Sequence, residues 1–283
     1  MKIAVSCEST ADLSKELIEK YKLNVIPFTV LIGDDSFLDG EIDNSLIFDY
    51  VNKTHHLPKT SAVNEFQYEA MFNKLKMEYD AVIHIASSSY MSSAYQNAKL
   101  VGDRIENIHV VDSESLSTGI ALLAIYASEL IDENKWTIEE IIQKIEKRKK
   151  FVLVSLLATR IDYLFKGGRC SMLQLLGANL LRLKPQIYMK DGKTVAGHKY
   201  RGNFETATMK YVADTLEQFN NYDKKHVFIS YTSAPLEIVE KVKKIFEDLK
   251  FENIHITQTG ATIACHCGDN CIGILYFYDG GDK

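Results

Sequence analysis

The sequence predicts an α/β protein of two lobes, each with a sheet flanked by helices. Short apolar, β-branched runs alternate with amphipathic helical patterns, which is typical of βα units and, in the first half, of a mainly parallel sheet. The 283 residues correspond to about two domains at roughly 150 residues each. Because 46% of the residues are hydrophobic and 25% are charged, the composition is that of a folded chain.

The first lobe is expected over residues 1–150. Apolar, β-branched runs predict strands at 2–6, 25–32, 36–38, 81–86 and 108–112. Helical periodicity predicts helices at 13–21, 45–54, 65–79, 92–104 and 117–133. Gly33-Asp34-Asp35 predicts a hairpin turn between the second and third strands. Thr137 and Glu140 predict a capping box for a further helix, which ends in the basic run 147–150 at the expected domain boundary.

The second lobe is expected over residues 151–283. It begins with a strand at 151–157 and a turn at Gly167-Gly168, and a hairpin is predicted through Asp191-Gly192. The remaining elements alternate again: helix 171–182, helix 203–220, strand 226–231, helix 235–249, strand 254–259 and strand 271–278. We leave open whether the last strand or the segment around His266 returns to the first lobe.

The net charge and the N-terminal sequence argue against two classes of protein, nucleic-acid-binding and secreted. A net charge of -5 argues against nucleic acid as a partner. The first six residues predict a strand instead of the long apolar segment of a secretory signal, and no 18 consecutive residues are apolar. We therefore expect a cytoplasmic protein.

A cluster of cysteines near the C-terminus raises the question of a metal or redox centre. Cys265, Cys267 and Cys271 surround His266, out of five cysteines in all. Structural zinc sites usually pair Cys-x2-Cys knuckles or add distal histidines, and this cluster lacks a second half. We expect no metal and no cofactor, and keep a Cys/His metal or redox protein as the least favoured alternative.

Hydroxyl side chains gather where predicted strands end and helices begin. Ser87-Ser88-Ser89 follows a strand, and Ser92-Ser93 opens the next helix; Thr60-Ser61 follows Pro58 and precedes another helix. In open α/β sheets, ligands bind beyond the carboxyl ends of the strands. Serine and threonine are also the usual helix caps. Capping and ligand binding are compatible, and both interpretations stay open.

Five motifs together identify a family resemblance. They are Glu8-Ser9-Thr10-Ala11-Asp12, the Ser88–Ala98 run, Val111-Asp112-Ser113, Lys166-Gly167-Gly168-Arg169 and the Gly260–His266 spacing. In this order the chain resembles, over nearly its whole length, the DegV family. These are two-domain bacterial proteins that bind a fatty acid and act as the lipid-presenting subunit of fatty acid kinase.

The resemblance implies a ligand site and a docking site. The expected carboxylate-binding residues are Thr60, Ser61, Ser92, Ser93 and His266, beside the glycine turn of Gly167, Gly168 and Arg169. Lys199 and Arg201 correspond to a surface that faces the catalytic subunit of the kinase. The implied partners are thus a long-chain fatty acid and that subunit, and transient membrane contact is left open.

The acyl chain requires an apolar tunnel, which we expect between the two lobes. The candidate lining residues are branched or flexible apolar side chains: Phe28, Val30, Ile125, Met172, Leu173, Leu175, Leu176, Leu180 and Leu181.

The sequence also departs from the family pattern. Glu8 replaces a common aspartate, and Ser93-Ala94 replaces Gly-Thr. Asp269-Asn270 replaces Pro-Gly, which is expected to bring a negative charge close to the ligand carboxylate.

A hydrolase is the main alternative. Ser92, Asp112 and His266 are the residue types of a nucleophile, an orienting acid and a base. The sequence lacks a Gly-x-Ser-x-Gly elbow, and it also lacks a Gly-x4-Gly-Lys-Ser/Thr phosphate loop. We therefore expect a binding protein whose ATP chemistry is supplied by another chain.

Overall fold

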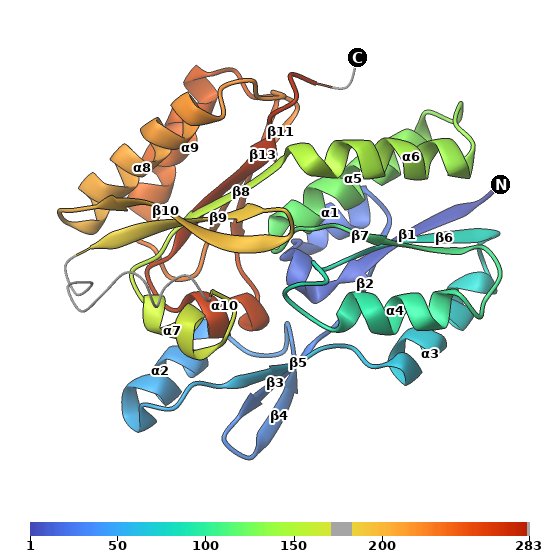
Figure 1. Cartoon of the computed structure of the whole chain (residues 1–283), viewed down its shortest axis with the longest axis horizontal. Helices are drawn as coiled ribbons and strands as arrows, with labels where there is room; N and C mark the ends of the chain where they lie inside the picture. The colour runs from blue at the N-terminus through green and yellow to red at the C-terminus, as the bar shows by residue number, and fades with distance from the viewer. Residues whose placement is uncertain (171–182, 282–283) are drawn as a thin grey trace.

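Three sheets and the helices around them make up the structure, a computed structural model that describes residues 1–170 and 183–281 (Figure 1). The strands are β1 (Ile3–Glu8), β2 (Leu23–Ile26), β3 (Thr29–Ile32), β4 (Asp35–Leu38), β5 (Lys59–Ser61), β6 (Ala81–Ala86), β7 (Ile108–Asp112), β8 (Val152–Leu157), β9 (Lys184–Lys190), β10 (Lys193–Tyr200), β11 (His226–Tyr231), β12 (Asn253–Gln258) and β13 (Ile272–Phe277). The helices are α1 (Lys15–Lys20), α2 (Asn44–Thr54), α3 (Glu65–Lys76), α4 (Ala94–Gly102), α5 (Thr118–Asp132), α6 (Ile138–Arg148), α7 (Ile161–Lys166), α8 (Phe204–Gln218), α9 (Leu236–Asp248) and α10 (Ala261–Cys267), with short 3-10 turns η1 (Ser9–Ala11) and η2 (Lys149–Phe151).

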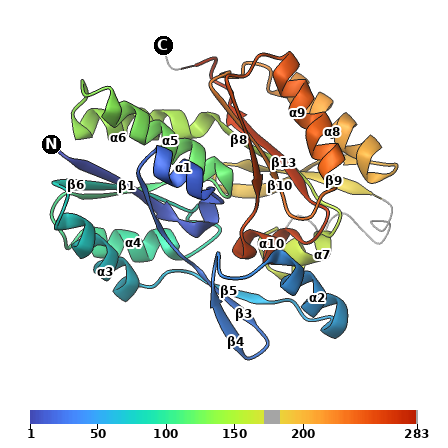
Figure 2. The same ribbon diagram turned by 180° about the vertical axis from the view of Figure 1, so that it is seen from behind.

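The sheets differ in topology. The first is wholly parallel, in the order β2-β1-β6-β7. The second has the order β10-β9-β8-β13-β11-β12 and is antiparallel except for the β11–β12 pair. The third is a small antiparallel sheet, β4-β3-β5, which lies below the other two in both views (Figure 2). The predicted α/β class with a parallel N-terminal sheet is confirmed.

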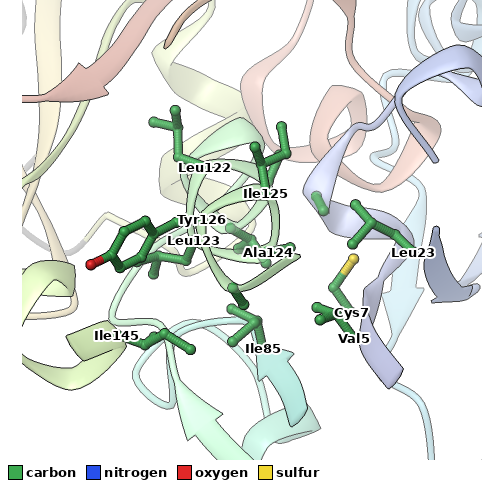
Figure 3. Packing of buried hydrophobic residues seen from close by; sticks show 14 of the residues in the cluster. Val5, Cys7, Leu23, Ile85, Leu122, Leu123, Ala124, Ile125, Tyr126 and Ile145 are labelled. Carbon is green, nitrogen blue, oxygen red and sulfur yellow. The ribbon is translucent and has the colours of Figure 1, made fainter. Parts of the chain in front are cut away.

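Helix α5 forms the layer between the two large sheets. It contacts β1 and β6 on one side and β8, β11 and β13 on the other. Residues 120–127 of α5 are all buried, because a helix covered on both sides has no face to expose. Ile125 belongs to this central core with Cys7 and Leu23, so its prediction as a tunnel residue is wrong (Figure 3).

The outer faces of the two sheets are covered by separate helices. Helices α3 and α4 contact strands of the first sheet, and α8 and α9 contact strands of the second. Helix α10 lies near the small sheet, where it contacts β3, β5 and α2 from the first half of the chain and α7 from the second. Strand β13 lies in the second sheet, between β8 and β11. The domain boundary near residue 150 stays a prediction.

Several local predictions agree with the structure residue for residue. Strands β6, β7 and β11 have the predicted bounds, and the two hairpins turn at Gly33 and Gly192 with φ of +63° and +75°. Thr137 and Glu140 form the predicted capping box at the start of α6. The predicted helix 171–182 lies outside the described residues.

Other predictions are wrong for identifiable reasons. The predicted strand 25–32 is two strands in two sheets, because Pro27 has no N–H to donate and interrupts the run. Ile26 pairs with β1, whereas Thr29 pairs with β4 and β5. Thr60-Ser61 is part of strand β5 instead of a helix cap; the cap of α3 is Asn64.

No helix among the described residues is both long and apolar enough to cross a membrane.

A pair of helical glycines tests how closely α5 packs on the second sheet. A Cβ at Gly119 would lie 2.6 Å from a methyl carbon of Val154 on β8 and closer still to Ser115, whereas a Cβ at Gly102 meets side-chain methyls of β7 at 3.0 and 3.2 Å. We expect Gly119→Ala to lower the free energy of unfolding by about 1–3 kcal/mol despite its helix propensity. Gly102→Ala is the matched control and is expected to cost less than about 1 kcal/mol. Equal denaturant midpoints for the two variants would contradict the close packing of α5.

Candidate ligand-binding site

A cavity of about 320 Å³ lies where the first sheet, the small sheet and the second sheet meet. Thr10 and Ser87 line it just beyond the carboxyl ends of β1 and β6, where ligands of parallel sheets usually bind. Its volume is at the lower end of the range for small-molecule sites. The cavity therefore has both the position and the size of a ligand site.

The five predicted carboxylate-binding residues all line this cavity. They come from three separate parts of the chain: Thr60, Ser61, Ser92, Ser93 and His266. The Thr60 Oγ1 and His266 Nε2 atoms are 3.0 Å apart, although the residues are 206 positions apart in the sequence. Ser92 Oγ accepts a hydrogen bond from the N–H of Ala94, the first residue of α4, at 3.1 Å, and it also lines the cavity; the N-cap residue itself is Ser93. Their role toward a ligand stays a prediction.

His266 is a neutral imidazole in this setting. Burial lowers its pKa to about 4, and the positive charge of Arg169 contributes. Its Nε2 bonds Thr60, while the buried Nδ1 has no hydrogen-bond partner among the residues the structure describes. A neutral imidazole of this kind hydrogen-bonds a ligand without forming an ion pair.

Three side chains of the first half of the chain hold the start of α10, which carries His266. Asp12 Oδ1 accepts the N–H of Gly260 at 2.7 Å, and Asp39 Oδ1 accepts the N–H of Thr262 at 3.2 Å. Asn44 donates to the carbonyl of Thr259 at 2.8 Å. These bonds satisfy backbone groups that a helix start leaves without partners.

The glycine turn lies against His266. A Cβ at Gly167 would come within 2.7 Å of His266 Nδ1, so a larger residue would displace the ring. Gly168 has φ +71°, a conformation that favours glycine. Arg169 lines the cavity, and its guanidinium donates to the carbonyls of Met91 at 3.3 Å and Gly167 at 2.7 Å. The turn thus brings a cation to the cavity.

The rest of the cavity wall is largely apolar. Phe28 lines it as predicted, together with Leu116, Leu156, Leu164, Ile187 and Ile263. A smaller cavity of about 20 Å³ shares Leu116, Leu156, Ile263 and Cys267 with it and is also lined by residues of β8, β11 and β13.

Several predicted tunnel residues are placed elsewhere. Val30 packs with Ala261 and Cys265 in a separate core cluster and does not line the cavity, so its prediction is wrong. The predicted lining residues between Met172 and Leu181 lie outside the part of the chain that is described. The five aliphatic residues found instead come from different elements, and no local pattern marked them.

Lys199 and Arg201 lie apart from the cavity. Both are exposed, Lys199 on the edge strand β10 and Arg201 just after it. Their role in docking stays a prediction.

The departures from the family pattern have weaker consequences than expected. Asp269 pairs with Arg160 at 3.3 Å and does not line the cavity, which corrects the expectation of a charge beside the ligand. Ala94 is buried in the core of the first sheet and does not line the cavity either.

The hydrolase triad is not assembled. Asp112 accepts hydrogen bonds from the N–H groups of Ser89 and Glu114, and it does not line the cavity. Among the described residues, no hydrogen bond links His266 to Ser92 or to Asp112.

The cysteines do not form a common cluster. Cys265 packs beside Val30, whereas Cys267 and Cys271 pack with Cys170 on the other side of α10. Within residues 1–170 and 183–281, no group of three or more His, Cys, Asp or Glu side chains is arranged to hold a metal ion.

Comparisons with known proteins agree on one family. The family described as "Uncharacterised protein, DegV family" matches residues 2–279. A DegV domain-containing protein of Clostridium perfringens is 29% identical over 97% of this chain and 98% of its own. The structure of DegV from Bacillus subtilis, described as a fatty acid binding protein, is 26% identical with a TM-score of 0.85, over 98% of this chain and 99% of its own.

A third neighbour shares the fold at lower identity. The fatty acid kinase B3 protein of Streptococcus pneumoniae, loaded with linoleic acid, is 18% identical with a TM-score of 0.83, over 99% of this chain and 100% of its own.

The Asp12 carboxyl group makes a prediction for stability against pH. Burial raises its pKa well above the usual 3.8, and the Asp39 carboxylate adds to this effect. A raised pKa in the folded state means that the stabilising contribution is present at low pH and is lost as the pH rises through the folded-state value. Asp12→Asn stays neutral and tolerates the left-handed backbone at this position. We therefore expect the unfolding free energy of the wild type to fall relative to that of Asp12→Asn as the pH rises from about 4 to neutral.

Asp43 provides a control, because its contribution to the unfolding free energy is expected to depend on pH in the opposite direction. It is exposed, and hydrogen bonds from Ser45 lower its pKa, so its contribution is lost as the pH falls. Denaturation at several pH values measures how the unfolding free energy of the wild type differs from that of Asp12→Asn and from that of the matched Asp43→Asn control. A constant difference between wild type and Asp12→Asn across this range would contradict the burial of Asp12 as a neutral acid.

Proposed function

The chain belongs to the DegV family, and from this premise we propose that it binds a long-chain fatty acid and presents the carboxylate to a separate ATP-dependent kinase. The observation that carries the proposal is a cavity lined both by hydroxyls and an imidazole and by aliphatic side chains. The description of the Bacillus subtilis relative as a fatty acid binding protein supports the ligand class.

The polar side of the cavity suits a carboxylate. A buried carboxylate must be hydrogen-bonded, since transfer from water without partners is costly. Ser92 offers a hydroxyl donor, and Arg169 supplies a positive charge. Thr60 offers a second hydroxyl donor when the neutral His266 donates its Nε2 proton to Thr60. Because the histidine is neutral, the head group is held mainly by hydrogen bonds. A head group held in this way remains available for reaction with a kinase.

The apolar side of the cavity suits an acyl chain. Each methylene removed from water contributes about 0.8 kcal/mol, so about 14 methylenes contribute on the order of 11 kcal/mol before the lost entropy of the chain is subtracted. Leu116, Leu156 and Ile263 line both the main cavity and its smaller extension, and the chain is proposed to follow them. The tail thus supplies affinity, and the polar side supplies orientation.

The partner is proposed to be the catalytic subunit of a fatty acid kinase. The sequence holds no phosphate loop of the Gly-x4-Gly-Lys-Ser/Thr kind, so this chain acts as the non-catalytic subunit. Lys199 and Arg201 are exposed and carry positive charge, which suits a docking surface. The Streptococcus pneumoniae kinase B3 protein has the same fold, which is compatible with this role.

Native mass spectrometry of the protein purified from bacteria tests the proposal. We expect the wild type to carry a long-chain fatty acid. His266→Ala and Ser92→Ala are expected to retain less of it, because each removes a partner of the buried carboxylate at a cost of about 1–3 kcal/mol.

His56→Ala is the matched histidine control, since His56 is exposed and does not line the cavity. The proposal is overturned if several wild-type preparations contain no fatty acid. Unchanged ligand content in both site variants would instead reject the assignment of the head group.

Reversal of a single charge tests the docking surface. Arg201→Glu is expected to leave the bound lipid in place and to slow acyl phosphate formation with the kinase, because a surface charge acts mainly on partner encounter. Lys210→Glu makes the same charge change on an exposed position of α8 and is expected to have a smaller effect. Loss of bound lipid in Arg201→Glu would place this residue in ligand binding instead.

A further inference from the structure

A fully buried carboxylate lies behind one wall of the cavity. Glu8, at the end of β1, is 0% exposed. Its Oε1 accepts a hydrogen bond from the Tyr68 hydroxyl at 2.6 Å and lies 3.0 Å from His84 Nε2. Its Oε2 accepts the backbone N–H of Ser87 at 2.9 Å and the Ser87 hydroxyl at 3.1 Å.

These four bonds define the ionisation state of Glu8. An ionised carboxylate only accepts hydrogen bonds and has about four sites for them. The Tyr68 hydroxyl and the N–H and hydroxyl of Ser87 occupy three, and His84 Nε2 occupies the fourth in the tautomer that carries its proton there. Burial opposes ionisation, but the charge and hydrogen bond of His84, with the bonds from Tyr68 and Ser87, lower the pKa of Glu8 below its usual value. Glu8 is therefore an anion, and it accepts the proton of the Ser87 hydroxyl.

The direction of the next hydrogen bond follows from this. Ser87 Oγ lies 2.8 Å from Thr10 Oγ1, and either oxygen is in principle the donor. A bond to an ionised acceptor is about twice as strong as a neutral one, so the single Ser87 proton goes to Glu8. Thr10 must then donate to Ser87, and both O–H bonds point toward Glu8.

Thr10 and Ser87 both line the cavity. With their protons directed at Glu8, their oxygens offer only lone pairs to a ligand. The wall formed by Thr10 and Ser87, called here the acceptor wall, is thus unsuited to a carboxylate, which has no proton to donate at neutral pH. By contrast, Arg169 can donate, and so can Thr60 when the neutral His266 carries its proton on Nε2 and donates it to Thr60. The two polar parts of one cavity therefore recognise different chemical groups.

We propose that the acceptor wall binds a hydroxyl group of the ligand, so that the preferred ligands are long-chain acids with a hydroxyl near the carboxyl end. This inference rests on the proposed function and deepens it by naming the ligand class. The carboxylate is held by the donors around His266, and the ligand O–H donates to Thr10. A plain acyl chain at this wall would cover the Thr10 oxygen with methylenes, which is unfavourable for a polar atom.

Competition binding with three ligands tests the inference on the full chain after removal of co-purified lipid. The ligands are hexadecanoic acid and its 2-hydroxy and 3-hydroxy derivatives. We expect the wild type to bind at least one hydroxy acid about three- to tenfold more tightly than the plain acid, the contribution of one neutral hydrogen bond. Thr10→Val keeps the side-chain shape and is expected to bring this ratio to about one.

Three further variants separate recognition from stability. Thr10→Ser retains the hydroxyl and is expected to retain the preference. Thr54→Val makes the same substitution at an exposed threonine of α2 and is expected to leave the ratio unchanged. Ser87→Ala interrupts the chain to Glu8, frees the Thr10 proton for the cavity, and is expected to reduce the preference for hydroxy acids. Because the readout is a ratio of affinities in one protein, a general loss of stability does not reproduce it.

The outcomes distinguish this inference from the proposed function. If the wild type binds hexadecanoic acid as tightly as both hydroxy acids, or if Thr10→Val keeps the preference, the acceptor wall does not select the ligand and the inference is wrong. If the wild type binds none of the three acids, the proposed function is wrong and the inference falls with it.

Discussion

The site depends on the attachment of α10 to the first half of the chain. Asp12 and Gly260, which are 248 positions apart, are joined by a hydrogen bond of 2.7 Å, and Asp39 and Asn44 add two more at the same helix start. Gly260 is required there, because a Cβ would lie 2.8 Å from Asp39 Oδ1. Together with the packing of Ala261 and Cys265 against Val30, these bonds bring His266 to Thr60. This attachment buries polar side chains, which is energetically unfavourable for a charged group. Burial accordingly raises the pKa of Asp12.

The position of the cavity follows from the layer that α5 forms. Both large sheets pack on this helix, so their edges are held together on either side of one buried element. The cavity lies at that junction, with Thr10 and Ser87 from the first sheet and Leu156 and Ile187 from the second. A ligand at this place contacts both halves of the chain. Packed elements transmit small displacements, so the geometry of the polar side depends on the packing of α5.

Charge is distributed unevenly around the cavity. Arg169 lies on the side of His266, and its charge helps to keep that imidazole neutral. The Glu8 anion lies behind the hydroxyls of Thr10 and Ser87 and is hydrogen-bonded to Tyr68, His84 and Ser87. Hydroxyl groups of the same chemical type therefore differ in what they offer a ligand, since their partners decide where each proton points.

The sequence by itself determined many of the elements and most of the candidate polar residues, but it predicted neither α7 nor α10 as a helix and did not predict β5 as a strand. Alternation of apolar runs was sufficient for the bounds of β6, β7 and β11, and the glycine turns and the Thr137 capping box were read from local rules. The hydroxyls after predicted strands were also visible, because the carboxyl ends of parallel strands meet at one edge of a sheet. Those local patterns are short-range, and they depend on few residues at a time.

Only the tertiary structure decided that Pro27 sends β2 and β3 to different sheets and that Ile125 belongs to the core. It also decided that Asp269 pairs with Arg160 and that Glu8 orients Ser87 and Thr10. The physical reason is that burial, ion pairing and the direction of a hydroxyl proton depend on neighbours that lie far away in the sequence.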